Sequence, residues 1–325
     1  MAAPPSPNPD RSLVAENATA PPSKNISLTV DDTMLLYKPD YIDTEFTTKN
    51  IRDFNLMVAK MTDPQRDSIC SIDFGGMLMI PQSDKLDRNF SAWLVSGVRV
   101  AEYVLHDGNS SVALMDADSF GRIISVPSSG IPVPKKLLPQ QKEAIMGLLD
   151  MPRIMSRAHN KEVLDNFVGK KLSYAENEEF LCSFAAYSVA TVLSPLAELP
   201  WEVAAALVDV RSIGSYNWAQ YALDFLVEKV AITQKDMKEM KPKITLNGCL
   251  VYLQVFYMEM ITDGRDRIDR SITPRMAAYQ ADKIKAMILS SKRGSNTCLL
   301  ARYGRRQFAR TTLLEDWTAD LQGRC

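Results

Sequence analysis

Two segments near the middle of the chain, Asn217–Val230 and Gly248–Ile261, have the clearest hydrophobic pattern. In the first, polar residues recur at steps of three and four and form one narrow stripe of a helix: Asn217, Gln220, Asp224 and Glu228. In the second, only Gln254 and Glu259 interrupt the apolar run. A helix that is apolar nearly all round must be enclosed by protein. We therefore predict that these two helices form the centre of a helical domain.

Helical periodicity covers most of the chain after residue 139. The pattern predicts further helices at Gln140–Leu149, Asn160–Val168, Ala175–Leu193, Trp201–Val210 and Pro274–Leu289. The last of these begins at Thr273-Pro274, where a capping residue is followed by a first-turn proline. This part of the chain is therefore expected to be helical throughout.

The region before residue 134 mixes helical and β signals. Asp63-Pro64 predicts the start of a short helix, Arg88–Val95 a second helix, and Asp116 the N-cap of a third helix that contains Phe120, Ile123 and Ile124. Two short β segments, Val100–Leu105 and Ser111–Met115, are separated by Asp107-Gly108-Asn109, which predicts a hairpin.

Two shorter segments of this region are irregular. Phe74-Gly75-Gly76 predicts a turn, and Met77–Ile80 after it is either a short strand or an extended buried segment. The proline-rich run Val126–Pro134 ends the preceding helix and predicts a linker.

These elements predict a mainly α protein: a helical bundle with a small N-terminal α+β part that contains a short β-hairpin. Three regions follow from the pattern. Residues 1–30 are rich in Pro, Ser, Asn and Ala and are expected to be a disordered tail. Residues 31–134 form the small α+β part, with its hairpin near residues 100–115. Residues 139–325 form the helical domain, which ends in a basic stretch.

Charge and composition narrow the classes of partner. The formal net charge of the 325-residue chain is −1, so no whole-chain attraction to nucleic acid or acidic membranes is expected. Proline interrupts the longest uncharged run, Leu181–Ala197, which is also shorter than the about 20 residues that span a bilayer. No signal peptide begins the sequence, and its five cysteines are scattered and odd in number. We predict an intracellular protein with reduced thiols and no membrane partner.

Few residues suggest catalysis or metal binding. No two of the cysteines and histidines have the close spacing of a zinc site, and no nucleotide-binding glycine loop occurs. Cys249, which follows Asn247-Gly248 at a helix start, could be a reactive thiol, but in so apolar a helix a buried small side chain is the favoured interpretation. We therefore predict no catalytic residue, no cofactor, no metal site and no enzymatic activity.

The stretch Lys283–Leu314 contains eight basic residues and no acidic one. The candidate nucleic-acid-binding residues within it are Lys292, Arg293, Arg302, Arg305, Arg306 and Arg310. Tyr303 and Phe308 lie among them and could stack on bases. The pairs Lys292-Arg293 and Arg305-Arg306 also loosely resemble a two-part nuclear import signal. The alternative is that this stretch pairs with the acidic Asp31–Glu45 stretch of the same chain.

Several segments, taken in order, suggest a family: Phe74–Ile80, Leu86–Leu94, Ile123–Gly130, Tyr216–Ala219 and Gly248–Gln254. Together they resemble plant proteins related to mobile elements that carry an "aminotransferase-like, plant mobile domain" type region. In many of those proteins the region lies upstream of a ubiquitin-like-protease (deSUMOylating) domain. The resemblance covers roughly Ile51 to Tyr279.

The resemblance implies a helical, non-catalytic part of a transposon-derived protein, and the family's name does not establish an aminotransferase. The protease's His-Trp pair and its Asp-Cys-Gly run are absent, since His106 precedes Asp107, His159 precedes Asn160, and Cys249 follows Asn247-Gly248. The protease domain is therefore expected to be missing.

Three functional hypotheses remain open. The first is a non-enzymatic, transposon-derived plant protein that acts through protein or nucleic-acid contacts in the nucleus, with the cytoplasm as the alternative location. Its alternative is a non-catalytic remnant or fragment of a deSUMOylating cysteine protease-like element protein. The second hypothesis, from a different class, is an enzyme or enzyme fragment that uses Cys249. The third is a degenerate element product with no selected activity.

Overall fold

The computed structural model describes residues 37–44, 48–81, 87–107, 111–146, 155–261, 268–293 and 303–308. The protein is mainly α with a few short strands, as predicted. The predicted tail, residues 1–30, lies outside the described residues.

Helices account for most of the described chain. The α-helices are α2 (Thr48–Ala59), α3 (Asp63–Ser71), α4 (Arg88–Ser96), α5 (Ala117–Ile124), α6 (Pro139–Met146), α8 (Arg157–Phe167), α9 (Tyr174–Ser188), α10 (Trp201–Leu207), α11 (Trp218–Lys238), α12 (Leu250–Ile261) and α13 (Ala281–Ser290). The tighter or wider helical turns are η1 (Gly75–Met79), η2 (Val189–Leu193), η3 (Val210–Ser215) and η4 (Arg275–Ala278). The strands are β1 (Tyr41–Thr44), β2 (Val98–Arg99), β3 (Val104–His106), β4 (Val112–Leu114) and β5 (Lys243–Leu246).

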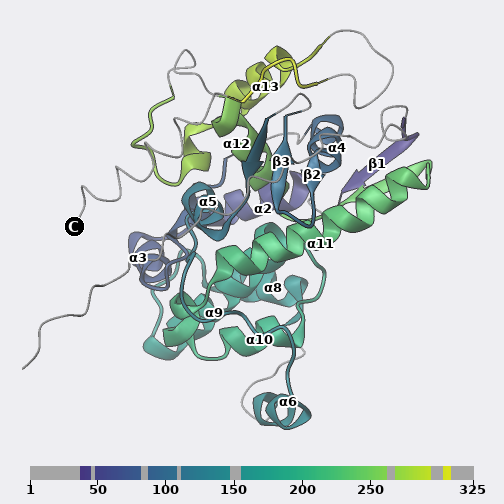
Figure 1. Cartoon of the computed structure of the whole chain (residues 1–325). Coiled ribbons are helices and arrows are strands. Elements are labelled where there is room, and N and C mark those ends of the chain that lie inside the picture. Colours follow the sequence, from purple (N-terminus) through teal and green to yellow (C-terminus); the bar gives the residue numbers. More distant parts are fainter. Residues whose placement is uncertain are drawn as a thin grey trace, which may run out of the picture.

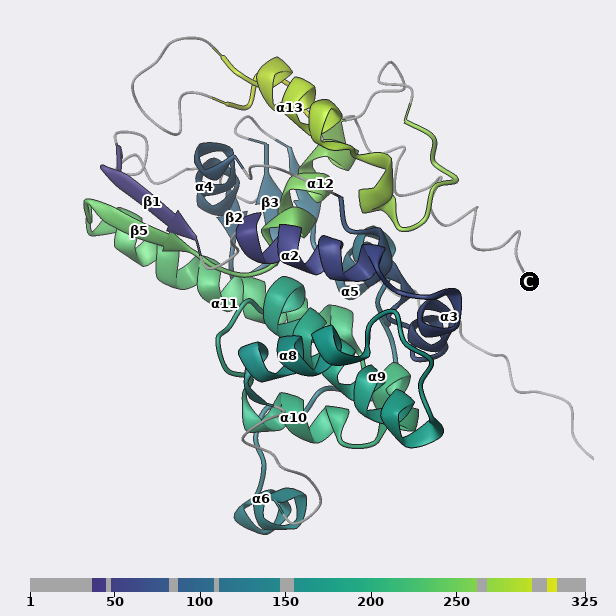
Figure 2. The same ribbon diagram turned by 180° about the vertical axis from the view of Figure 1, so that it is seen from behind.

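The long helix α11 crosses the molecule between two groups of elements (Figure 1). On one side lie α4, α12, α13 and the small β2–β4 sheet, and on the other lie α8, α9 and α10 (Figure 2). The helix α6 projects away from the rest in both views. Nine of the 21 residues of α11 are buried, among them Trp218, Leu226 and Val230, and the others are partly or fully exposed, so this helix is less enclosed than its apolar pattern predicts.

Two small sheets complete the fold. Strands β2, β3 and β4 form an antiparallel sheet in chain order, which confirms the predicted hairpin. Gly108 and Asn109 of its turn lie outside the described residues. Strands β1 and β5 pair in parallel, with Tyr41 opposite Lys243. This pairing joins the start of the described chain to a segment next to α11.

The predicted cap of α5 is confirmed, whereas α3 begins at the predicted Asp63-Pro64 with a different N-cap residue. The Asp116 carboxylate accepts a hydrogen bond from the Ser119 backbone N–H at 2.7 Å and so caps α5. The N-cap of α3 is Thr62 and not Asp63; the Thr62 backbone N–H donates to Gln65 Oε1 at 3.1 Å, and Pro64 lies in the first turn. Local sequence signals therefore specify these helix ends.

Three predicted elements are wrong in detail. Met77–Ile80 was expected to be a short strand or an extended segment, but Met77 to Met79 belong to η1 and Ile80 follows it; Gly76 in the same turn lies so close to the end of α5 that a β-carbon there would stand 2.1 Å from the Ile124 carbonyl oxygen. The strand β5 falls where only helices were expected, since its partner β1 is distant in sequence. The predicted helix Pro274–Leu289 is split into η4 and α13 at Tyr279, whose buried hydroxyl donates to Glu259.

A single hydrophobic cluster extends from Tyr37 to Phe308 and includes both predicted parts of the chain. Trp218 of α11 and Cys249 beside α12 are completely buried in it. The helix α12 is enclosed as its pattern predicts, whereas α11 is buried along only part of its circumference. The division at residues 134 to 139 remains a prediction, and β1 and β5 connect its two sides.

Candidate functional site

The predicted basic site follows α13 in the chain. Four of its six residues are described: Lys292, Arg293, Arg305 and Arg306. Their side chains are exposed, except that of Arg306, which is half-buried. Arg302 and Arg310 lie outside the described residues.

Two of these arginines hold the backbone of the protein itself. Arg293 donates from Nη2 to the Gly304 carbonyl oxygen at 2.7 Å, and Arg306 donates from Nη2 to the Ile261 carbonyl oxygen at 2.9 Å. Both contacts fix the segment 303–308 against the body of the protein. A nucleic acid would have to share or replace them.

The two aromatic residues of the basic stretch belong to the core. Tyr303 and Phe308 are buried, with their rings 5.2 Å from Phe90 and 5.8 Å from Tyr257 between centroids, and Tyr303 also contacts Trp93. The prediction that these rings could stack on bases is therefore wrong. They anchor the segment 303–308 to the core, because rings of this size bury a large apolar area.

The pairing of the basic stretch with the acidic stretch of the same chain stays a prediction. Of the acidic stretch 31–45, residues 37–44 are described. Asp43 forms an ion pair with Lys243 at 3.4 Å, and the neighbouring Ile42 carbonyl accepts from Arg88 Nη1. The partners of this segment therefore come from β5 and α4.

Cys249 has the environment of a core residue. It is fully buried, and burial raises the pKa of its thiol to about 12. The thiol therefore stays protonated at neutral pH, whereas catalysis requires the thiolate. His106 is also buried, and burial lowers the pKa of its imidazole. The favoured interpretation of Cys249 as a buried small side chain agrees with this environment.

A cavity of about 680 Å³ lies along α11, and we call it the α11 groove. It is lined by Val100, Tyr103, Pro132, Val133, Pro134, Lys135, Leu196, Pro200, Glu202, Val203, Asn217, Gln220, Tyr221, Asp224, Phe225, Val227, Glu228 and Lys229. More than half of these side chains are apolar or aromatic. Its size is within the range of ligand sites in proteins, about 300–1,000 Å³.

The whole polar stripe of α11 faces this groove. Its four members, Asn217, Gln220, Asp224 and Glu228, all belong to the lining. The stripe recurs every three or four residues, so one side of the helix presents it to the same space. The polar stripe of α11 therefore lies on a partly exposed side of the helix.

Asp224 is the centre of a polar network in the α11 groove. Its Oδ1 accepts from the Tyr103 hydroxyl at 3.1 Å and from Gln220 Nε2 at 2.6 Å. Its Oδ2 lies 2.9 Å from Lys135 Nζ. The Lys135 side chain is 85% exposed and that of Asp224 23% exposed. A partly buried carboxylate thus accepts from two donors in the body of the protein and pairs with one exposed lysine at the surface.

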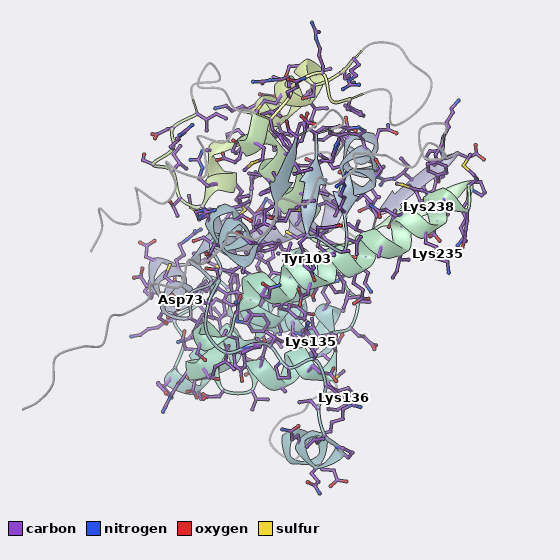
Figure 3. All side chains as sticks on the ribbon, in the orientation of Figure 1. Asp73, Tyr103, Lys135, Lys136, Lys235 and Lys238 are labelled. Carbon is purple, nitrogen blue, oxygen red and sulfur yellow. The ribbon has the colours of Figure 1, made fainter. Side chains whose placement is uncertain are left out.

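The electrostatics of this network follow from the carboxylate. Burial, and then the charge of Asp224, raise the pKa of Tyr103, so its hydroxyl remains a donor at neutral pH. The hydrogen bond to Asp224 raises the pKa of Lys135. Tyr103 has a φ of 53°, an uncommon conformation for an aromatic residue, in the turn between β2 and β3. Figure 3 shows Tyr103 beside α11, with Lys135 farther along towards α6.

The proline-rich run predicted to be a linker forms one wall of the groove. Asn217 caps α11 by accepting from the Gln220 N–H at 2.8 Å, and it donates from Nδ2 to the Ser128 carbonyl at 2.9 Å. Gly130 has a φ of 106° and lies against Ser215, where a β-carbon would stand 2.2 Å from the carbonyl oxygen. These contacts fix the run to the start of α11, so Pro132 to Lys135 have a defined position.

Sequence reasoning identified the polar stripe but did not predict the α11 groove. Tyr103, Lys135 and Asp224 come from three distant segments, and no local pattern connects them. The regular spacing of the stripe was the available signal. Among the described residues, no group of His, Cys, Asp and Glu could hold a metal ion, and no helix has the length and apolar character needed to cross a bilayer.

Comparison with known proteins gives one match. Residues 47–254 match a family described as "Domain of unknown function (DUF8566)". This range contains every residue that lines the α11 groove and ends before the basic stretch. No curated protein and no solved structure matches the chain. Since the match covers more than half of the sequence, the chain belongs to the DUF8566 family.

Proposed function

We propose that the protein is a non-enzymatic binding protein that acts through contact with another protein at the α11 groove. The observation behind this proposal is the Asp224 network. Tyr103 and Gln220 orient the Asp224 carboxylate inside a largely apolar cavity, and its ion-pair partner is the exposed Lys135. Apolar sites with a few well-placed polar groups are typical of specific binding.

The same residues favour binding over catalysis. The lining of the groove contains no cysteine, serine or histidine. Cys249 lies in the core with its pKa raised to about 12. We include in the proposal the origin that the sequence resemblance implies, a transposon-derived plant protein, and a location in the nucleus.

The non-enzymatic part is tested by thiol labelling. In the folded protein iodoacetamide should modify Cys70, which is exposed, and should modify Cys182 and Cys249 only after unfolding. Mass spectrometry of the digested protein assigns each adduct. Labelling of Cys249 in the folded protein faster than a free thiol would contradict the proposal and support a cysteine enzyme.

The protein contact is tested by site-specific photocrosslinking in cells that make the protein. Benzoylphenylalanine replaces Ile131, which is 53% exposed next to Pro132 in the groove wall. The matched control is Ile232, which is 52% exposed on α11 and does not line the groove. A protein adduct should form at position 131 and not at 232. Equal adducts at both positions, or none at 131, would argue against a partner at the groove.

Binding of nucleic acid through the basic stretch is the second candidate function. It is supported by the exposed side chains of Lys292 and Arg305, which hold no backbone carbonyl among the described residues, and by the eight basic residues of the stretch. Location in the nucleus would suit this function.

Fluorescence anisotropy with labelled duplex and single-stranded DNA at low salt tests this candidate. Lys292→Glu and Arg305→Glu should weaken binding to both, together with Arg302→Glu and Arg310→Glu. Lys235→Glu, at a side chain 75% exposed on α11, is the control for a general charge effect. Binding that survives the four reversals would exclude the basic stretch as the site.

A further inference from the structure

We infer that the α11 groove takes an extended basic peptide segment of the partner protein, with an arginine or lysine side chain replacing the Lys135 ammonium at Asp224. The inference rests on the proposed function, because it assumes that the groove binds a protein. It adds the chemical class of the segment and the place where its charge is recognised.

The charges of the lining favour a cation. Three carboxylates and two ammonium groups line the groove. Lys135 is paired with Asp224, and Lys229 is paired with Glu228 at 2.8 Å and lies 4.9 Å from the centroid of the Phe225 ring. Among the described residues, Glu202 has no ion-pair partner. The lining therefore has an excess negative charge, and an acidic ligand would have to separate both lysines from their carboxylates.

The Asp224 site can exchange its cation without losing its shape. Tyr103 and Gln220 continue to hold Oδ1 when Lys135 leaves Oδ2. The ion pair that is broken involves a lysine that is 85% exposed, and such pairs contribute little to stability. The departing ammonium regains its full hydration, whereas the incoming cation gains an oriented carboxylate. Asp224 is thus a fixed acceptor with a replaceable partner.

The remaining walls suit the apolar part of an extended segment. Pro132 and Pro134 form one side, and Tyr221 and Phe225 of α11 form another. Rings and prolines of this kind contact extended and proline-containing peptides in many recognition grooves. A nucleic acid would bring phosphate charges to a lining with excess negative charge, which favours a peptide over a nucleic acid here.

Defined peptides test the inference. Four pools of fluorescein-labelled heptapeptides have arginine, lysine, norleucine or glutamate fixed at the centre and mixed proline and apolar residues elsewhere. Anisotropy with the full chain should show binding of the arginine and lysine pools, with norleucine and glutamate weaker by about tenfold or more, as expected when a charged hydrogen-bonded pair is lost. Asp224→Asn, which keeps the shape of the side chain, should weaken the basic pools by a similar factor.

Lys135→Ala determines the sign of the ligand's charge. If the ligand is basic, removal of the competing internal cation should strengthen binding by about twofold, because the exposed ion pair that the ligand would otherwise have to break is weak. Lys136→Ala is the matched control, since Lys136 is the adjacent exposed lysine and does not line the groove (Figure 3). It should leave binding unchanged.

The outcomes separate this inference from the proposed function. Preference for the glutamate pool, or weaker peptide binding by the Lys135→Ala variant, would contradict the inference that the ligand is basic. The proposal of a protein contact at the groove would still stand. If no pool binds but a protein adduct still forms at position 131, the groove recognises a folded surface. That result would contradict the inference that it binds an extended peptide. Absence of both peptide binding and the adduct would overturn the proposed function as well.

Discussion

The helices α11 and α12 have similar apolar patterns but use their polar residues in opposite ways. On α12, Gln254 donates to the buried Ser91 hydroxyl at 2.8 Å, and Glu259 forms a two-point ion pair with Arg275. On α11, Asp224 faces the α11 groove and is closed off by the exposed Lys135. A polar residue on a largely apolar helix is therefore either satisfied internally or placed at an opening.

The two helices thus have two polar clusters: Glu259 with Arg275, which we call the α12 cluster, and Asp224 with Lys135, which we call the α11 cluster. Their exposure decides which of them contributes to stability. The side chains of Arg275 and Glu259 are 12% and 9% exposed, and Arg275 also donates to the Asp269 and Ile272 carbonyl oxygens. Loss of one member would leave a charge buried without its partner, which is costly. In the groove, by contrast, water can replace Lys135 at Asp224. We expect the α12 cluster to hold the fold and the α11 cluster to be exchangeable.

The largest expected effect is that of Arg275→Ala. It leaves the Glu259 carboxylate buried with the Tyr279 hydroxyl as its remaining donor among the described contacts, so unfolding free energy should fall by about 3–5 kcal/mol. Urea denaturation followed by circular dichroism measures the change. The double variant Glu259→Leu with Arg275→Leu is the control and should cost less than Arg275→Ala, because it leaves no unpaired charge. A loss below about 1 kcal/mol in Arg275→Ala would remove the distinction between the two clusters.

A smaller effect is expected for Gln254→Leu on the same helix. This change removes the donor to the Ser91 hydroxyl, which is completely buried, and should cost about 1–3 kcal/mol. Adding Ser91→Ala to Gln254→Leu should recover part of that loss, since the unpaired hydroxyl is then absent. Thermal unfolding of the three variants measures both steps. If the double variant is no more stable than the single one, the buried hydrogen bond is not the cause.

The structural features that the sequence predicted correctly are those that depend on residues close together in the chain. The periodicity of α11 and α12, the Asp116 cap and the β3–β4 hairpin are all local features, and each is present in the structure. The mainly α fold could be predicted because most of the chain repeats a helical pattern.

The errors concern contacts between distant segments. The strand β5 exists because β1 pairs with it, and Tyr303 is buried because Phe90 and Trp93 form a site for its ring. No spacing within the basic stretch distinguishes a buried ring from an exposed one. The groove was missed for the same reason, since Asp224 acquires Lys135 through the docked proline-rich run.

The smallest effect on stability is expected for Lys135→Ala in the α11 groove. Lys135→Ala should change the unfolding free energy by less than about 0.5 kcal/mol, because the lysine is 85% exposed and its pair with Asp224 competes with water. Raising the salt concentration to 1 M should remove what difference there is, since exposed pairs are screened and buried ones much less so. Urea denaturation of the wild-type and variant proteins at low and high salt measures this directly, with Arg275→Ala as the variant whose deficit should persist in salt. A loss as large as that of Arg275→Ala would mean that Lys135 is structural, and Asp224 would then have no replaceable partner to give up to a ligand.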